Sequence, residues 1–73
     1  MRLTAAEINA THIDQRITFS WHFPSGVDAE VCGDLRQIDH DAHQTVLNLT
    51  SSHESNGRLD EFVLTHDTTV VLL

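Results

Sequence analysis

Hydrophobic and polar residues alternate most regularly in residues 17–23. The apolar side chains of this segment, three of them aromatic, all fall on one parity: Ile17, Phe19, Trp21 and Phe23. Successive side chains of a strand point to opposite faces of a sheet. The pattern therefore predicts a strand whose aromatic face, Trp21 included, is buried. Pro24, Ser25 and Gly26 follow and are typical of a turn.

A second alternating segment covers residues 27–38, and its pattern shifts by one residue near its end. Apolar or small residues keep one parity as far as Leu35, and Ile38 then breaks it. One extra residue in a strand indicates a β-bulge, and Gly33 is a natural place for strong curvature. We therefore predict a long, bent strand.

Three more strands are predicted, in residues 45–52, 58–64 and 69–73. Leu47 and Leu49 are expected to face the core in the first of these. Asn56 and Gly57 separate the first strand from the second, and this dipeptide favours a type I′ hairpin turn, because both positions need positive φ.

The N-terminal segment carries the signature of a helix start. Thr4 and Glu7 have the spacing of a capping box, and Leu3 and Ile8 have the spacing of a hydrophobic staple. We predict a helix over residues 5–10. Because so short a helix is unstable alone, it must dock on the rest of the fold.

The predicted fold is mainly β: one domain over residues 1–73, with a short N-terminal α-helix followed by five antiparallel strands. This element order and the bent second strand resemble the small SH3-like and Sm-like β-barrels. The resemblance implies a closed five-stranded barrel and, for the Sm-like members, RNA binding. Residues 3–8 and 13–19 also resemble small uncharacterised proteins carried by phages of actinobacteria, and this likeness implies no catalytic residues.

Composition is consistent with one globular domain without covalent staples. The 73 residues are 40% hydrophobic and 21% charged, and Cys32 is the single cysteine, which excludes an intrachain disulfide and a cysteine zinc cluster. The apolar run at residues 70–73 is far too short to span a bilayer, and the N-terminal residues contain no apolar signal-peptide core. We expect a cytoplasmic protein.

The charge balance argues against binding to a polyanion. The chain has eleven acidic residues, four arginines and no lysine, for a net charge of −7. Nucleic acid would therefore be repelled unless folding gathered the arginines on one surface. Nucleic-acid binding by an Sm-like barrel, which the resemblance implies, is kept as the alternative function. The six histidines make the net charge pH-sensitive near pH 6, and whether they sense pH stays open.

No catalytic or cofactor-binding arrangement is identifiable. Ser20 and His22 share a strand face, Cys32 lacks a histidine at a recognisable spacing, and His53-Glu54 and His66-Asp67 are sequence neighbours whose side chains usually diverge. The segment His40-Asp41-Ala42-His43 has metal-ligand chemistry, but a turn does not place both rings on one face. We interpret it as a polar hairpin loop, and we predict no enzyme activity, no cofactor and no metal site.

The function that these patterns favour is a non-enzymatic protein-interaction or assembly module, with an acidic surface that docks a protein partner. The alternative for the acidic residues is a solvated surface that maintains solubility. Residues 70–73 are apolar on both faces, which predicts a homo-oligomer through strand-edge pairing, unless the N-terminal helix covers them. The residues predicted to form the interaction surface are Asp28, Glu30, Asp34, Asp60, Glu61, Val71 and Leu73.

Overall fold

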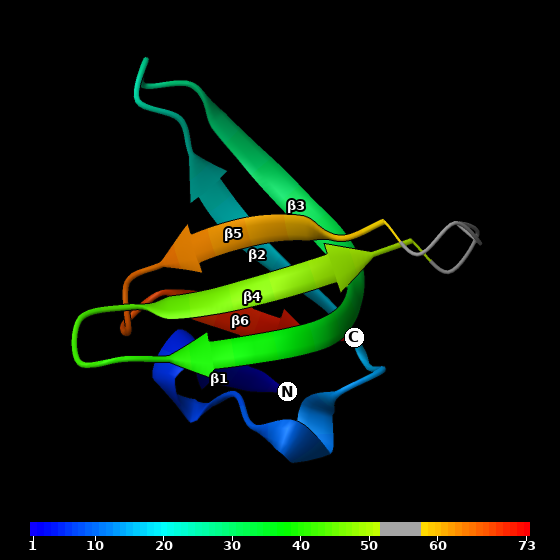
Figure 1. Ribbon diagram of the computed structural model, residues 1–73. Coiled ribbons are helices and arrows are strands. Elements are labelled where there is room, and N and C mark those ends of the chain that lie inside the picture. The colour runs from blue at the N-terminus through cyan, green and yellow to red at the C-terminus, as the bar shows by residue number, and fades with distance from the viewer. Residues whose placement is uncertain (52–57) are drawn as a thin grey trace.

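The computed structural model describes residues 1–51 and 58–73, which form one open, antiparallel, six-stranded sheet of order β1-β6-β2-β3-β4-β5. Figure 1 shows that β4 and β5 cross in front of β2 and β6, so the sheet folds over on itself. No described helix is long and apolar enough to cross a membrane. The strands are β1 (Arg2–Thr4), β2 (Arg16–His22), β3 (Asp28–His40), β4 (Thr45–Thr50), β5 (Asp60–Leu64) and β6 (Thr69–Leu72).

The prediction of an N-terminal α-helix followed by a closed five-stranded barrel is wrong. Among the described residues β1 and β5 are the two edges of the sheet, and a sixth strand, β1, pairs with β6 through the register Leu3↔Val70. A strand of three residues is too short to show an alternating pattern. β1 exists because β6 offers it a partner, which is a tertiary effect.

The predicted helix over residues 5–10 is replaced by two 3-10 turns, η1 (Ala5–Glu7) and η2 (Ala10–His12). The predicted contact at its start does form: the backbone N–H and the hydroxyl of Thr4 donate to Glu7 Oε1 over 2.8 and 3.0 Å. Asn9 then caps the second turn, because its Oδ1 accepts from the Thr11 N–H at 3.0 Å. Asparagine side chains compete for backbone donors in this way, so a new turn begins where an α-helix would have continued.

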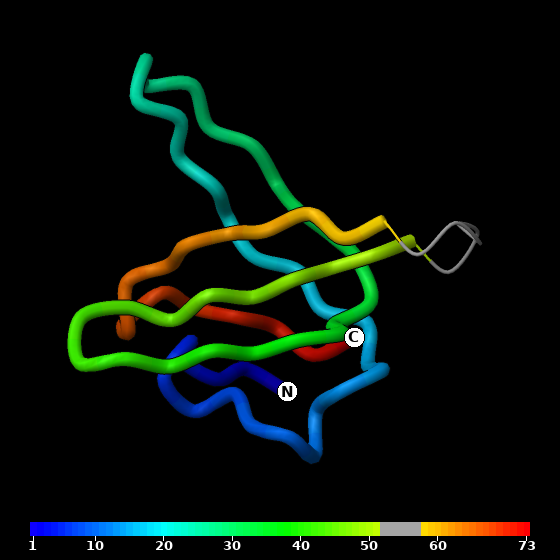
Figure 2. Tube along the Cα trace, in the orientation of Figure 1, coloured from blue at the N-terminus to red at the C-terminus, as the bar shows by residue number. Residues whose placement is uncertain are grey.

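The long, bent second strand is confirmed as β3. Its register with β4 shifts between Leu35 and Gln37, as the broken alternation predicts. The first half of β3 pairs with β2 and the second half with β4, so the bend carries the chain from one layer to the other. Figure 2 shows the same bend of β3 in the Cα trace. Gly33 is buried where the end of β4 passes: a Cβ there would lie 3.1 Å from the Thr50 carbonyl oxygen.

The core lies between the two layers. Ile17, Phe19, Leu47 and Leu49 are buried, as predicted. The prediction for the end of the aromatic face is wrong, since Trp21 is only half-buried and Phe23 is 45% exposed. The cause is visible in Figure 1, where the β2–β3 hairpin extends past the rest of the sheet. The core also includes Ala5, Ile8, Leu35, Leu64 and Val70.

The remaining strand boundaries differ from the predictions by one or two residues. β4 ends at Thr50, β5 begins at Asp60 and β6 ends at Leu72. The predicted Asn56-Gly57 turn lies outside the described residues. β6 is flanked by β1 on one side and β2 on the other, so it is an interior strand. The predicted homo-oligomer would therefore have to form through another surface than β6.

Candidate functional site

The candidate site is the solvent-facing side of β2, the first half of β3 and the end of β6, which we call the outer face. Its residues on β2 have the parity opposite to buried Ile17 and Phe19. Register then sets Ser20 beside Glu30 and His22 beside Asp28. The outer face comprises Arg16, Thr18, Ser20, His22, Asp28, Glu30, Cys32, Asp34, Val71 and Leu73.

His22 and Asp28 form an exposed cross-strand pair near the tip of the hairpin. His22 Nδ1 lies 2.5 Å from Asp28 Oδ1, and the two side chains are 73% and 70% exposed. A carboxylate only accepts hydrogen bonds, so Nδ1–H donates here. So exposed a pair contributes little to stability. Both groups therefore stay accessible to a partner.

Glu30 is held in place by a hydroxyl group. One of its oxygens accepts from Ser20 Oγ at 3.3 Å, and the other lies 3.1 Å from Thr18 Oγ1. The Thr18 hydroxyl has a single proton, and it donates mainly to the nearer Val31 carbonyl oxygen, at 2.8 Å. A neutral hydroxyl orients a carboxylate without cancelling its charge. The centre of the outer face is therefore a fixed negative charge.

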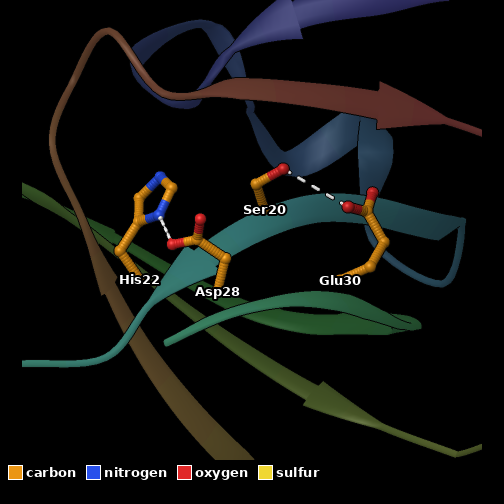
Figure 3. Close-up of polar contacts among 4 residues, drawn as sticks. All are labelled: Ser20, His22, Asp28 and Glu30. Carbon is orange, nitrogen blue, oxygen red and sulfur yellow. Dashed lines mark hydrogen bonds and ion pairs between the residues drawn. The ribbon is translucent and has the colours of Figure 1, made fainter. Parts of the chain in front are cut away.

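Ser20 and His22 are two residues apart on one face, but their contacts differ from those of a nucleophile and its base. A serine nucleophile needs the histidine within hydrogen-bond reach. Figure 3 shows Ser20 directed at Glu30 and His22 directed at Asp28, as two separate cross-strand pairs. The four side chains form polar pairs along a hairpin.

The structure brings most of the predicted surface residues together. Asp28, Glu30 and Val71 lie on the outer face, and Asp34 joins them through an ion pair with Arg16 at 3.2 Å. Leu73 is 67% exposed and adjoins Arg16, whose carbonyl oxygen accepts from the Leu73 N–H. Asp60 reaches the border, where it lines a depression of about 170 Å³ with Arg16 and Cys32. Glu61 stands apart, because it pairs with Asn48 in the other layer.

A notch beside the outer face has no counterpart in the sequence-based predictions. It is an open pocket of about 520 Å³ between β2 and the connection from β5 to β6. No residue pattern signals it, because it exists only where the pairing of β6 with β2 stops, at Thr18↔Val71. We call it the notch; it is lined by Ser20, Trp21, His22, Val63, Leu64, Thr65, Thr68 and Thr69.

The histidine-rich segment, which begins at the last residue of β3 and continues into the turn after it, has structural contacts. His40 Nε2–H donates to the Ile8 carbonyl oxygen at 2.7 Å, and Nδ1 lies 2.8 Å from the hydroxyl of buried Thr45. Asp41 Oδ1 accepts from the backbone N–H groups of His43 and Gln44, which lowers the pKa of Asp41. Within residues 1–51 and 58–73 no three histidine, cysteine or acidic side chains are grouped as metal ligands.

The other polar pairs named in the sequence analysis add no site. Asp67 Oδ1 accepts from the Thr65 hydroxyl at 2.7 Å inside the turn between β5 and β6. His53 and Glu54 lie outside the described residues. Cys32 is exposed on the outer face.

Comparisons of the chain with protein-family models, with curated proteins and with solved structures find no match.

Proposed function

We propose that this protein is a non-enzymatic interaction module that binds a protein partner through the outer face. The observation that carries the proposal is the alignment of Asp28, Glu30 and Asp34 along one side of β3, with Glu30 oriented by the Ser20 hydroxyl. Side chains fixed before binding lose little entropy when a partner docks.

The composition of the outer face fits a partner of opposite charge. Val71 and Leu73 add apolar area on the same face, across β2 from the acidic row, and the whole chain carries a net charge of −7. Protein interfaces combine apolar area with polar groups, and complementary charge accelerates association. The partner surface is therefore basic, with apolar residues beside the basic ones.

A protein is favoured over a nucleic acid because two of the four arginines are engaged with acids. Arg16 pairs with Asp34 at 3.2 Å, and Arg36 pairs with Asp14 at 3.3 Å. Binding to a phosphate backbone requires uncompensated positive charge along one surface. The outer face offers the opposite sign.

The resemblance to proteins of actinobacterial phages extends the proposal to a small phage-encoded protein that acts on a host protein in the cytoplasm. Self-association into a homo-oligomer also stays a prediction, and it now requires a surface other than the interior strand β6.

The test is a pull-down from host lysate with the tagged protein, after nuclease treatment, with bound proteins identified by mass spectrometry. The wild type is compared with the double variant Asp28→Asn/Glu30→Gln. The matched control is Asp39→Asn/Glu61→Gln, which removes the same charge from exposed positions in the β3–β4–β5 layer. We expect one specific protein on the wild type and the control, and about 10-fold less on the outer-face variant.

Two results would count against this proposal. Equal capture by both double variants would remove the outer face as the binding surface. Loss of every bound protein on nuclease treatment would shift the function to nucleic-acid binding.

A further inference from the structure

The strand edge at the notch is open for pairing. β2 pairs with β3 along its whole length, Arg16–His22, whereas its pairing with β6 ends at Thr18↔Val71. In the described part of the chain, the second half of β2 therefore has a strand neighbour on one side only. An unpaired edge is a template for a further strand.

Hydrogen bonds along the hairpin show which residues of β2 face β3. The Phe23 N–H donates to the Val27 carbonyl oxygen at 2.8 Å, and the Leu35 N–H donates to the Gln15 carbonyl oxygen at 3.0 Å. In an antiparallel pair, alternate residues direct their backbone groups to the same neighbour. The odd-numbered residues of β2 are therefore bonded to β3.

The even-numbered residues direct their backbone groups to the opposite side. Arg16 does so at the start of β2, where its carbonyl oxygen accepts from the Leu73 N–H at 2.9 Å. The same alternation turns the N–H and C=O groups of Ser20 and His22 to this side, beyond the end of the β6 pairing. Both residues line the notch.

The notch has room for a short extended segment. Its volume of about 520 Å³ lies within the range of about 300 to 1,000 Å³ that is usual for ligand pockets. The register Thr18↔Val71 would set Thr69 opposite Ser20, but the pairing has already ended there, so a segment paired with Ser20 and His22 would enter beside Thr69, where the chain turns away through Thr68. Figure 1 shows β6 in the rear layer, well short of the hairpin tip.

The side chains around the notch define the occupant. Half-buried Trp21 offers apolar surface on its inner side, and its aromatic ring is fixed edge-on against Phe62, with centroids 5.1 Å apart. On the outer side, Ser20 and His22 border the notch. Ser20 is hydrogen-bonded to Glu30, and His22 to Asp28. A strand presents its side chains alternately to the two sides. The matching segment therefore alternates apolar and basic residues.

We propose that the notch binds an extended segment of the partner protein, which adds as a strand to the edge of β2 at Ser20 and His22. Its apolar residues cover Trp21, and its arginines or lysines lie over the outer face, within reach of Glu30 and Asp28. This inference rests on the proposed function and names the chemistry of the partner.

The test uses the whole protein and a short capped peptide of alternating valine and arginine. Trp21 is the only tryptophan, so its fluorescence reports occupation of the notch directly. Amide hydrogen exchange followed by NMR reports the new hydrogen bonds. We expect saturable quenching or enhancement of the fluorescence, and exchange at the Ser20 and His22 amides slowed at least about 10-fold, with that of Phe19 and Trp21 unchanged.

Two control peptides separate backbone pairing from charge attraction. Two versions of the same peptide are N-methylated at alternate backbone positions, one at the valines and one at the arginines. Both keep the charge, and each loses the N–H donors on one edge, so the version methylated on the edge that faces β2 should not bind. A valine and glutamate peptide of equal length should not bind either. Equal binding of the two N-methylated peptides, or unchanged amide exchange at Ser20 and His22, would overturn the strand-addition proposal.

The remaining outcomes distinguish this inference from the proposed function. Protection of the two amides in the concentrated protein alone, with a doubled mass by light scattering, would assign the edge to a second copy of this chain and overturn the inference. A captured partner whose binding is lost in the outer-face variant, but which leaves the Ser20 and His22 amides unprotected, would also overturn the inference. The proposed function as an interaction module would then be retained.

Discussion

At the scale of single residues, Gly33 shows how one missing side chain permits the fold. It lies in β3 just before the bulge, and its backbone is buried against the end of β4. A Cβ would lie 3.1 Å from the Thr50 carbonyl oxygen and 3.3 Å from Leu49 Cβ. A backbone oxygen cannot rotate away, so the strands would have to separate.

Substitution of Gly33 by valine should therefore destabilise the protein. Overpacking of a filled core costs about 1–3 kcal/mol. For a domain of this size, that corresponds to a melting temperature lower by roughly 4–8 °C per kcal/mol. The control is Cys32→Val on the exposed side of the same strand, which should change stability by less than about 0.5 kcal/mol. Equal melting temperatures for the two variants in thermal denaturation would show that β4 does not pack this closely.

At the scale of elements, β1 is short but covers the edge of β6. The register Arg2↔Val71 and Leu3↔Val70 forms this pairing, and the Leu72 N–H donates to the Met1 carbonyl oxygen at 2.7 Å. Val70 is fully buried. Without β1, an apolar strand would present open backbone groups to solvent, and such edges promote association.

Deletion of residues 1–3 should lower stability and increase self-association. The expected result is a lower melting temperature and a mass that rises with concentration in analytical ultracentrifugation. Arg2→Ala in the full chain is the control, because it keeps the backbone pairing and removes only an exposed side chain. A truncated protein that stays monomeric and melts like the control would mean that β1 contributes nothing to the sheet.

At the scale of the whole molecule, the stability of the fold depends on pH through two carboxylates that accept local hydrogen bonds. Hydrogen bonds from the backbone and the hydroxyl of Thr4 lower the pKa of Glu7 below 4.5. Backbone N–H groups of His43, then Gln44, lower that of Asp41 below 3.8. Glu7 secures η1 and Asp41 secures the β3–β4 turn. A carboxyl whose pKa is lower in the folded state stabilises the fold above its unfolded value, and this contribution disappears as pH falls through the folded value.

We therefore expect the melting temperature to fall between about pH 5 and pH 3. The double variant Glu7→Gln/Asp41→Asn should melt lower at neutral pH and lose less stability in this range. Asp39→Asn/Glu61→Gln removes the same charge from exposed strand positions and serves as the reference. A double variant with the same acid dependence as this reference would assign the loss to general charge effects.

Several features of the fold were predictable from local patterns. Alternation in residues 17–23 identified β2 and its buried Ile17 and Phe19, and the shift before Ile38 identified the bulge in β3. These predictions succeed because side-chain parity is a property of the strand itself. The acidic row on β3 follows from the same parity.

Tertiary pairing decided what local patterns cannot express. It produced β1, made β6 an interior strand, left the sheet open, and carried Phe23 out past the core. It also ended the β2–β6 pairing at Thr18, which created the notch. The sequence by itself thus determined which way the side chains of each long strand face. Which strands become neighbours, and where their pairing stops, depends on contacts between segments far apart in the chain, and those emerge only when the whole sheet folds over its core.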